Sequence, residues 1–276
     1  MSKSSVVIGK SGTGKTFVAA HLAMALGYLG ERTLLVGCDQ KQDARRALSA
    51  EARPSLMEAV EQAGFDYDQV NLDDVIASVS QYVDVMELGP SQLIVGHYGS
   101  VLDEAFHLFT VRRLLEQYDR IVLDVSEERF DSAFAPLFRW VESAVAVTDD
   151  SSESLFVLNR LLRASLIGYY EFQYPLRIVG VVHNRTRQEH AFNRYVQRTQ
   201  CFPLMTIHEE AGLGNLRHFH KTLFGLKKPS REQDRVITDF VKVADLLRAN
   251  PLNLVPISPL PDEEVWQLDP PVPFPN

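Results

Sequence analysis

The stretch Val6-Val7-Ile8-Gly9-Lys10-Ser11-Gly12-Thr13-Gly14-Lys15-Thr16 runs from an apolar strand into the phosphate-loop pattern G-x-x-x-x-G-K-T. In this pattern the glycines let backbone N–H groups turn towards the phosphates of a nucleotide, and the lysine, here Lys15, reaches the outer phosphates. Apolar residues at helical spacing follow from Lys15 to Leu29, so the context is strand, loop and helix rather than a chance glycine-rich turn. The pattern predicts a nucleotide site whose members are Gly9, Lys10, Ser11, Gly12, Thr13, Gly14, Lys15 and Thr16, with the Thr16 hydroxyl as a ligand of Mg²⁺.

Length and composition favour one large α/β domain. The chain has 276 residues, and its 45% hydrophobic content argues against disorder. No run approaches the roughly 20 apolar residues of a membrane span, and no charged-then-apolar leader precedes the first strand, so we expect a cytoplasmic protein without membrane contact. The net charge of −8 disfavours a general role on nucleic acid, although a local basic stretch could meet an acidic partner: Arg217, Lys221, Lys227, Lys228 and Arg231.

Strand and helix patterns alternate along most of the chain. Strands are expected at 32–39, 83–88, 120–125, 143–147, 177–183 and 203–207, with helices near 55, at 102–118, at 151–166 and at 231–249. This alternation predicts a doubly wound, mainly parallel sheet flanked by helices, over residues 1–250. Ligands in such sheets bind at the carboxyl ends of the strands, where the phosphate loop, Asp39 and Asp124 all fall.

The last 26 residues differ in composition from the rest. They contain eight prolines, which cannot continue a helix or a central strand. We therefore expect residues 251–276 to form an extended tail, either disordered or lying across a partner with Trp266 and Phe274 as its contacts.

Two segments carry a resemblance to a known family. Lys10 directly follows the first glycine of the loop, and Gly37-Cys38-Asp39-Gln40-Lys41-Gln42-Asp43 follows the second strand. These segments resemble the nitrogenase iron protein and the iron proteins of the dark-operative protochlorophyllide and chlorophyllide reductases, which share deviant phosphate loops with the septum-site and chromosome-partition ATPases. The family reads Gly-Cys-Asp-Pro-Lys-x-Asp, so Gln40 replaces a proline. A solvated loop lysine and a polar turn are the simpler alternatives.

The resemblance assigns a role to each residue of these segments. Lys10 crosses a dimer interface to the partner's nucleotide. Asp39 lies near the attacking water, Lys41 near the phosphates, and Asp43 near Mg²⁺ and the switch.

Two later segments complete the predicted site. Ile121-Val122-Leu123-Asp124-Val125 is an apolar strand ending in an acid, the usual place for the carboxylate that holds Mg²⁺. The family continues with Asp-Val-x-Gly-Asp, so the resemblance puts a second acid at Glu128. Asn184 matches the asparagine that hydrogen-bonds adenine in the family, and the guanine signature N-K-x-D is absent. The resemblance therefore implies ATP.

The chain departs from the family at its cluster ligands. Iron proteins hold one [4Fe–4S] cluster between two subunits through two cysteines from each, but an ungapped match puts His97 and Asp131 at those positions. Cys38 and Cys201 lie at other positions, so neither replaces these ligands. We expect both to be small, buried, apolar side chains. We predict no iron–sulfur cluster. In a dimer His97 and Asp131, with Tyr98 beside them, would meet at the axis, where a partner-docking surface or ion pair is preferred to a zinc site.

These residues predict a MgATP-binding and hydrolysing homodimeric switch that gates or assembles a partner protein. Lys10 and Lys15 would stabilise charge on the phosphoryl oxygens, and Asp39 or Glu128 would orient water. Three alternatives stay open. They are a scaffold that binds ATP without hydrolysing it, a positioning ATPase of the septum-site or partition type, and a metallochaperone ATPase, although the Cys-x-Cys pair typical of the last is missing.

Overall fold

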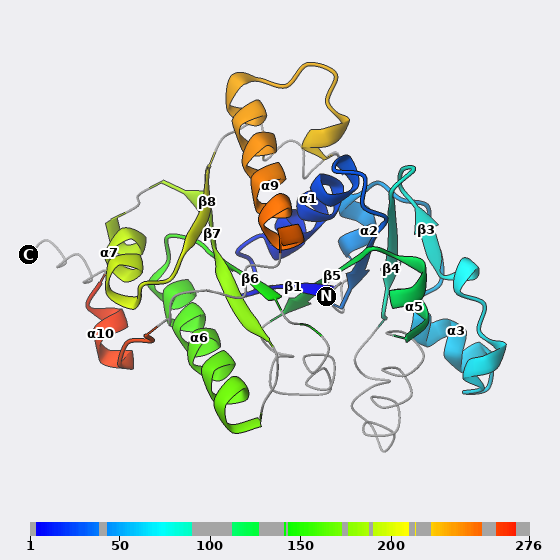
Figure 1. The fold of residues 1–276 in the computed structure, drawn as a ribbon, viewed down its shortest axis with the longest axis horizontal. Helices are drawn as coiled ribbons and strands as arrows, with labels where there is room; N and C mark the ends of the chain where they lie inside the picture. Colours follow the sequence, from blue (N-terminus) through cyan, green and yellow to red (C-terminus); the bar gives the residue numbers. More distant parts are fainter. Residues whose placement is uncertain are drawn as a thin grey trace, which may run out of the picture.

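The computed structural model describes residues 4–38, 43–89, 112–126, 141, 143–172, 176–187, 190–209, 213, 222–249 and 258–268. Within these ranges the chain forms one eight-stranded sheet. Its strands are β1 (Ser4–Gly9), β2 (Thr33–Gly37), β3 (Ile76–Ser78), β4 (Val83–Glu87), β5 (Arg120–Ser126), β6 (Ser143–Thr148), β7 (Arg177–Thr186) and β8 (Pro203–His208). In space their order is β3-β4-β2-β5-β1-β6-β7-β8, so β1 lies inside the sheet (Figure 1).

The described strand pairs are parallel except for β3 and β4. The predicted doubly wound, mainly parallel sheet is therefore confirmed. Sequence reasoning missed β3, because its three residues are too short to show a strand alternation. Parallel neighbours need long crossover connections, and the helices of this chain supply them.

Helices cover both faces of the sheet (Figure 1). One face carries α1 (Lys15–Tyr28), α2 (Asp43–Ala47) and α9 (Arg231–Ala249). The other carries α3 (Leu56–Gln62), α6 (Ser152–Phe172), α7 (His190–Thr199) and α10 (Asp262–Trp266), while α5 (Arg112–Gln117) leads into β5. Short 3₁₀ helices cover Tyr67–Gln69, Leu72–Asp74 and Leu223–Gly225. Among the described helices, none combines the length and the apolar character that crossing a bilayer requires.

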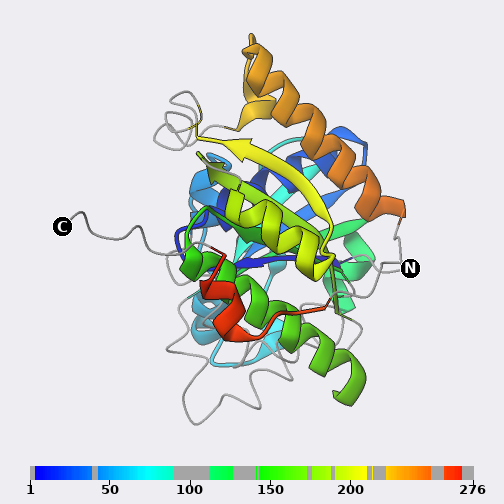
Figure 2. The same ribbon diagram turned by 90° about the vertical axis from the view of Figure 1, so that its left-hand side faces the viewer.

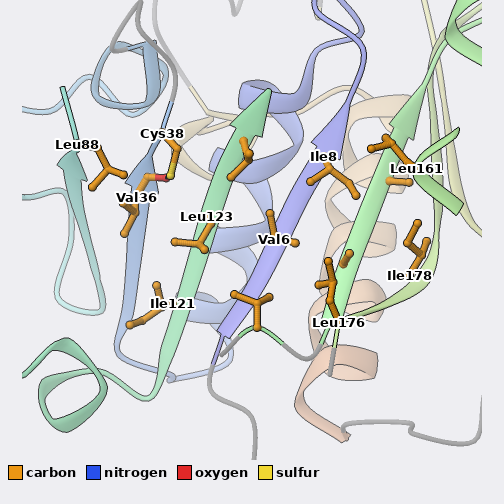
Figure 3. Packing of buried hydrophobic residues seen from close by; sticks show 14 of the residues in the cluster. Val6, Ile8, Val36, Cys38, Leu88, Ile121, Leu123, Leu161, Leu176 and Ile178 are labelled. Atoms are coloured by element: carbon orange, nitrogen blue, oxygen red, sulfur yellow. The ribbon is translucent and has the colours of Figure 1, made fainter. Parts of the chain in front are cut away.

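The apolar core has two layers because successive residues of each strand face opposite sides of the sheet. Val6 and Ile8 belong to the layer that packs under α6, together with Leu161 and Ile178 (Figure 3). Val7 belongs to the layer under α1 and α9. All six residues of β1 are buried, as expected for a central parallel strand covered on both faces.

Residues 258–268 pack onto α6 and α7, which corrects the expectation of an extended tail for this part of 251–276 (Figure 2). The side-chain amide of Asn159 on α6 donates to the carbonyl O of Leu260 at 2.8 Å and accepts from the N–H of Leu260 at 2.8 Å. Trp266 stacks on Phe156 of the same chain, with 5.2 Å between ring centroids. The prolines end helices locally, but long-range side-chain contacts fix the segment. Phe274 lies outside the described residues.

Candidate nucleotide site

The loop between β1 and α1 winds around the ammonium group of Lys15. The carbonyl O of Lys10 accepts hydrogen bonds from Thr13 Oγ1 at 2.9 Å and from Lys15 Nζ at 3.1 Å. Gly14, at the start of α1, has φ 91°, a left-handed value that a side chain would strain. Lys15 is only 6% exposed. A turned-in loop and a buried ammonium at a helix N-terminus form the arrangement that receives phosphate groups.

The candidate magnesium ligands lie at the same edge of the sheet as this loop. Asp124 is the fifth residue of β5 and pairs in register with Val7 of β1, two residues before the loop begins. Its side chain is buried, at 2% exposure. Thr16 is the second residue of α1 and is half-buried. The structure therefore places a hydroxyl and a carboxylate of the kind that Mg²⁺ binds at the same edge of the sheet.

A second buried acid, Glu87, lies near Asp124 and was not predicted from the sequence. Glu87 is the last residue of β4, is 0% exposed, and accepts a hydrogen bond from the backbone N–H of Arg45 at 2.8 Å. Burial raises the pKa of the Glu87 carboxyl to about 7, against the lowering effect of the Arg45 N–H, and the carboxylates Asp124 and Asp43 raise it further. The available signal was Glu87 itself, an acid at the end of the mostly apolar strand Val83–Glu87.

Lys10 pairs within its own chain. Its Nζ lies 2.6 Å from Glu153 Oε2, near the start of α6, and the two side chains are 29% and 68% exposed. An exposed pair of this kind contributes little stability, about 0 to 1 kcal/mol. Breaking this pair would therefore cost the protein little stability.

Asn184 joins the far side of the site to the phosphate loop. Its Nδ2 donates to the carbonyl O of Thr13 at 2.6 Å, while its buried Oδ1 has no hydrogen-bond partner within the described residues. The next residue, Arg185, takes a left-handed backbone with φ 61° and donates to the carbonyl O of Gly12 at 3.0 Å. Asn184 and Arg185 of β7 thus both donate hydrogen bonds to the phosphate loop. Asn184 Oδ1 remains a buried acceptor without a partner in the described residues. Sequence reasoning missed Arg185, for which local sequence carries no signal.

Asp150 fixes the end of β7 on which Asn184 lies. Its carboxylate accepts from Thr186 Oγ1 at 2.7 Å and from the backbone N–H of Arg187 at 2.5 Å. His183 Nε2 lies 2.8 Å from Asp150 Oδ1, and the imidazole stacks on Phe192. Asn184 is therefore held from both sides along the strand.

Several predicted residues lie outside the described ranges: Asp39, Lys41, Glu128, His97, Tyr98 and Asp131. Asp43 is described, begins α2 and lies 3.6 Å from Arg46. In the described part of the chain, no group of three or more histidine, cysteine, aspartate and glutamate side chains is arranged to hold a metal ion. Of the basic stretch, Lys227, Lys228 and Arg231 are described and exposed.

Both cysteines are buried free thiols, as predicted. Cys38 follows β2 and Cys201 precedes β8, so the two lie in different halves of the sheet. Cys38 Sγ contacts the carbonyl O of Val36 at 3.7 Å. Burial raises the pKa of the Cys201 thiol.

Comparison with solved structures finds the same fold in proteins that were solved with adenine nucleotides. The septum site-determining protein MinD of Pyrococcus horikoshii, solved with Mg-ADP, superposes with a TM-score of 0.68 at 19% identity, over 92% of this chain and 100% of that one. McdA of Cyanothece, solved with ATP, gives 0.71 at 16% identity, over 90% and 96%. At these identities the likeness concerns the fold.

Sequence comparison finds relatives at higher identity. The light-independent protochlorophyllide reductase iron-sulfur ATP-binding protein of Halorhodospira halophila is 29% identical over 262 residues, which are 95% of this chain and 86% of that protein. The family model described as 4Fe-4S iron sulfur cluster binding proteins, NifH/frxC family, matches residues 3–269. Because this match spans almost the whole chain, the protein belongs to the NifH/frxC family.

Proposed function

We propose that this chain is a MgATP-binding and hydrolysing homodimeric switch that acts on a partner protein and holds no [4Fe–4S] cluster. The observation that carries the proposal is the folded phosphate loop, in which Lys15 is buried beneath the turn with Asp124 at the same edge of the sheet. Members of the family are P-loop ATPases, and the relative from Halorhodospira halophila is described as ATP-binding.

The residues of the predicted site suit MgATP. Lys15 would neutralise the outer phosphates, Thr16 and Asp124 would hold Mg²⁺, and Asp39 or Glu128 would orient the attacking water. Bound Mg²⁺ would offset the charge that develops on the phosphoryl oxygens. The unpartnered Oδ1 of Asn184 is an acceptor, which suits the amino group of adenine.

The residues do not suit a shared [4Fe–4S] cluster, although the family description names one. Such a cluster needs four thiolates, two from each subunit, at one place. This chain has two cysteines, both buried, one beside β2 and the other beside β8. Strands β5, β1, β6 and β7 separate those positions in the sheet, so one subunit cannot present both thiols to one cluster.

Dimerisation and partner docking complete the proposal. Lys10 would leave Glu153 and reach the nucleotide of the second subunit, which closes the dimer around ATP. His97 and Asp131, where the family match puts the cluster cysteines, would form the partner-facing surface together with Tyr98. ATP turnover would then alternate the dimer between two shapes that the partner distinguishes.

Calorimetry and a phosphate-release assay test the nucleotide claim. Lys15→Ala should weaken MgATP binding by about a hundredfold or more, since it removes the charge beneath the phosphates. The matched control is Lys242→Ala, which removes an exposed lysine of α9 that pairs with Asp239 at 3.0 Å. Equal ATP affinity in wild type and Lys15→Ala would contradict the proposal. Tight binding with negligible turnover would replace the switch by a scaffold that ATP stabilises.

Metal analysis and affinity capture test the remaining parts. Anaerobically reconstituted protein should be colourless, and about four irons per dimer would contradict the assignment. Replacing His97 and Asp131 together by alanine should weaken partner capture by ATP-locked protein while partner-free hydrolysis stays within about twofold. Stoichiometric zinc that these variants lose would show a metal site instead of a docking surface, and unchanged capture would remove docking at this surface.

A further inference from the structure

Glu87 is a buried carboxyl group to which the proposed chemistry gives no role. It ends β4 with no exposed surface, and no ion pair to it is formed within the described ranges. One oxygen, Oε1, accepts from the backbone N–H of Arg45, while Oε2 is buried without a hydrogen-bond partner in the described part of the molecule. A carboxyl in such surroundings is costly to keep, so its position calls for a physical reason.

The absence of a side chain at Gly37 leaves room for this carboxyl. Glu87 on β4 and Asp124 on β5 both pair in register with Gly37 of β2, so the three residues form one row and face the same side of the sheet. A Cβ on Gly37 would lie 1.9 Å from Glu87 Oε2 and 2.9 Å from the Cβ of Ala44. Only glycine admits both the carboxyl and α2 at this place.

The carboxyl caps α2 from a neighbouring strand. The first backbone N–H groups of a helix have no partner inside the helix, and a nearby side chain usually accepts one of them. Here Arg45, the third residue of α2, donates its N–H to Glu87 at 2.8 Å, and the helix dipole favours an acid at that end. The Arg45 guanidinium also donates to the carbonyl O of Arg53.

We propose that Glu87 is a positioning residue of the nucleotide switch, which fixes the first turn of α2, and with it Asp43, beside Asp124. Asp43 begins α2 and belongs to the same predicted switch segment as Asp39 and Lys41, two residues after Lys41. Glu87 touches no phosphate-loop residue in any described hydrogen bond, so it acts on hydrolysis through α2. Its effect on turnover rests on the proposed function, whereas its effect on α2 does not.

Hydrogen–deuterium exchange of the nucleotide-free protein tests the structural part. Glu87→Ala removes the acceptor of the Arg45 N–H and should speed exchange of the peptide covering residues 43–50 by about tenfold. Glu87→Gln keeps an acceptor oxygen of the same shape and should stay within about threefold of wild type. The matched control is Asn71→Ala, because Asn71 accepts from the backbone N–H of Asp73 at 3.2 Å and caps the 3₁₀ helix Leu72–Asp74. It should speed exchange in that helix and leave 43–50 unchanged.

Steady-state kinetics test the functional part. Glu87→Ala should lower kcat for ATP by about tenfold with KM within about twofold, since the phosphate loop keeps its own contacts, and Glu87→Gln should restore most of kcat. Unchanged exchange and unchanged kcat in folded Glu87→Ala would overturn the proposal. If wild type neither binds nor hydrolyses ATP, the proposed function fails, and the exchange experiment still decides whether Glu87 holds α2.

A second variant covers the case in which Glu87→Ala does not fold. In Gly37→Ala the added methyl group would collide with the Glu87 carboxyl and with Ala44, while Glu87 itself is kept. It should speed exchange over residues 43–50 by about tenfold while peptides of α6 and α7 exchange as in wild type. Wild-type exchange in folded Gly37→Ala would show that the row does not position α2.

Discussion

Two buried asparagines, Asn159 and Asn184, stand in opposite states of hydrogen bonding. Both are 0% exposed. Asn159 uses both ends of its amide on the backbone of Leu260, and its Oδ1 also accepts from the Tyr195 hydroxyl at 3.2 Å. Asn184 donates to Thr13 but leaves Oδ1 without a partner in the described residues.

The difference separates two uses of a buried polar group. A group whose partners all come from the same chain stabilises the fold, and removing it leaves several others unsatisfied. A group that lacks a partner costs stability until something supplies the partner. The C-terminal segment is of the first kind, and the nucleotide edge, with Asn184 and Glu87, is of the second. Four variants test this comparison, from the largest expected effect to the smallest.

Asn159→Ala breaks the complete network. It removes the acceptor of the Leu260 N–H and of the Tyr195 hydroxyl, while the Leu260 carbonyl O keeps the Arg163 guanidinium at 2.7 Å, so the free energy of unfolding should fall by about 3 kcal/mol and Tm by roughly 6 to 12 °C. Calorimetric unfolding measures this, with the exposed Gln197→Ala on α7 as control, expected within about 0.5 kcal/mol. ATP affinity of the folded variant should not change. A loss as small as that of the control would mean that this network does not stabilise the C-terminal segment.

Glu87→Gln tests the incomplete network through pH. Because the pKa of Glu87 is raised from 4.5 to about 7, both folded and unfolded states hold the proton below about pH 4.5, and only the unfolded state loses it readily as the pH rises. The free energy of unfolding of wild type should therefore fall by up to about 3 kcal/mol relative to that of Glu87→Gln between pH 4.5 and 7. Above pH 7 the difference between the two proteins should stay constant. Arg45, Asp43 and Asp124 face the same carboxyl and stay in both proteins. Denaturant unfolding at pH 5 and pH 8 measures this, and parallel curves would contradict the raised pKa.

Asn184→Ala removes the acceptor that lacks a partner. ATP affinity should fall by about tenfold and the preference for ATP over GTP should shrink, because the acceptor proposed for the adenine amino group is gone. The loss of unfolding free energy should be smaller than for Asn159→Ala, since one unsatisfied atom leaves with the side chain. Calorimetry with both nucleotides measures the change. Equal stability losses at the two asparagines would abolish the distinction between them.

Glu153→Gln has the smallest expected effect. It frees Lys10 from an exposed ion pair, so dimerisation with an ATP analogue should tighten by at most about fivefold. Light scattering against protein concentration measures it, with Asp239→Asn, which frees the exposed Lys242, as control. Weaker dimerisation in Glu153→Gln would show that Glu153 supports closure.

Local patterns predicted the sheet and the phosphate loop, because strand alternation, glycine positions and the acid of Asp124 are all recorded within a few residues. They failed where a contact spans the chain. Asn159 and Leu260 are 101 residues apart, and no proline count reveals that an amide receives the segment. Glu87 was missed because an acid at a strand end becomes informative only when Gly37 and Arg45 are placed beside it. Asn184 was predicted from the family resemblance. The hydrogen bond from Arg185 to Gly12 could be found only from the structure, because the two residues lie 173 positions apart in the sequence.

The contacts of residues 258–268 with α6 and α7 can form only late during synthesis of the chain. Ribosomes add about 5 to 20 residues per second, so Leu260 is made roughly 5 to 20 s after Asn159. From the synthesis of α7 until that of Leu260, α6 and α7 lack the segment that packs on them in the complete fold, and the amide of Asn159 lacks both of its backbone partners. The nascent chain therefore carries an apolar surface that only the last contacts cover.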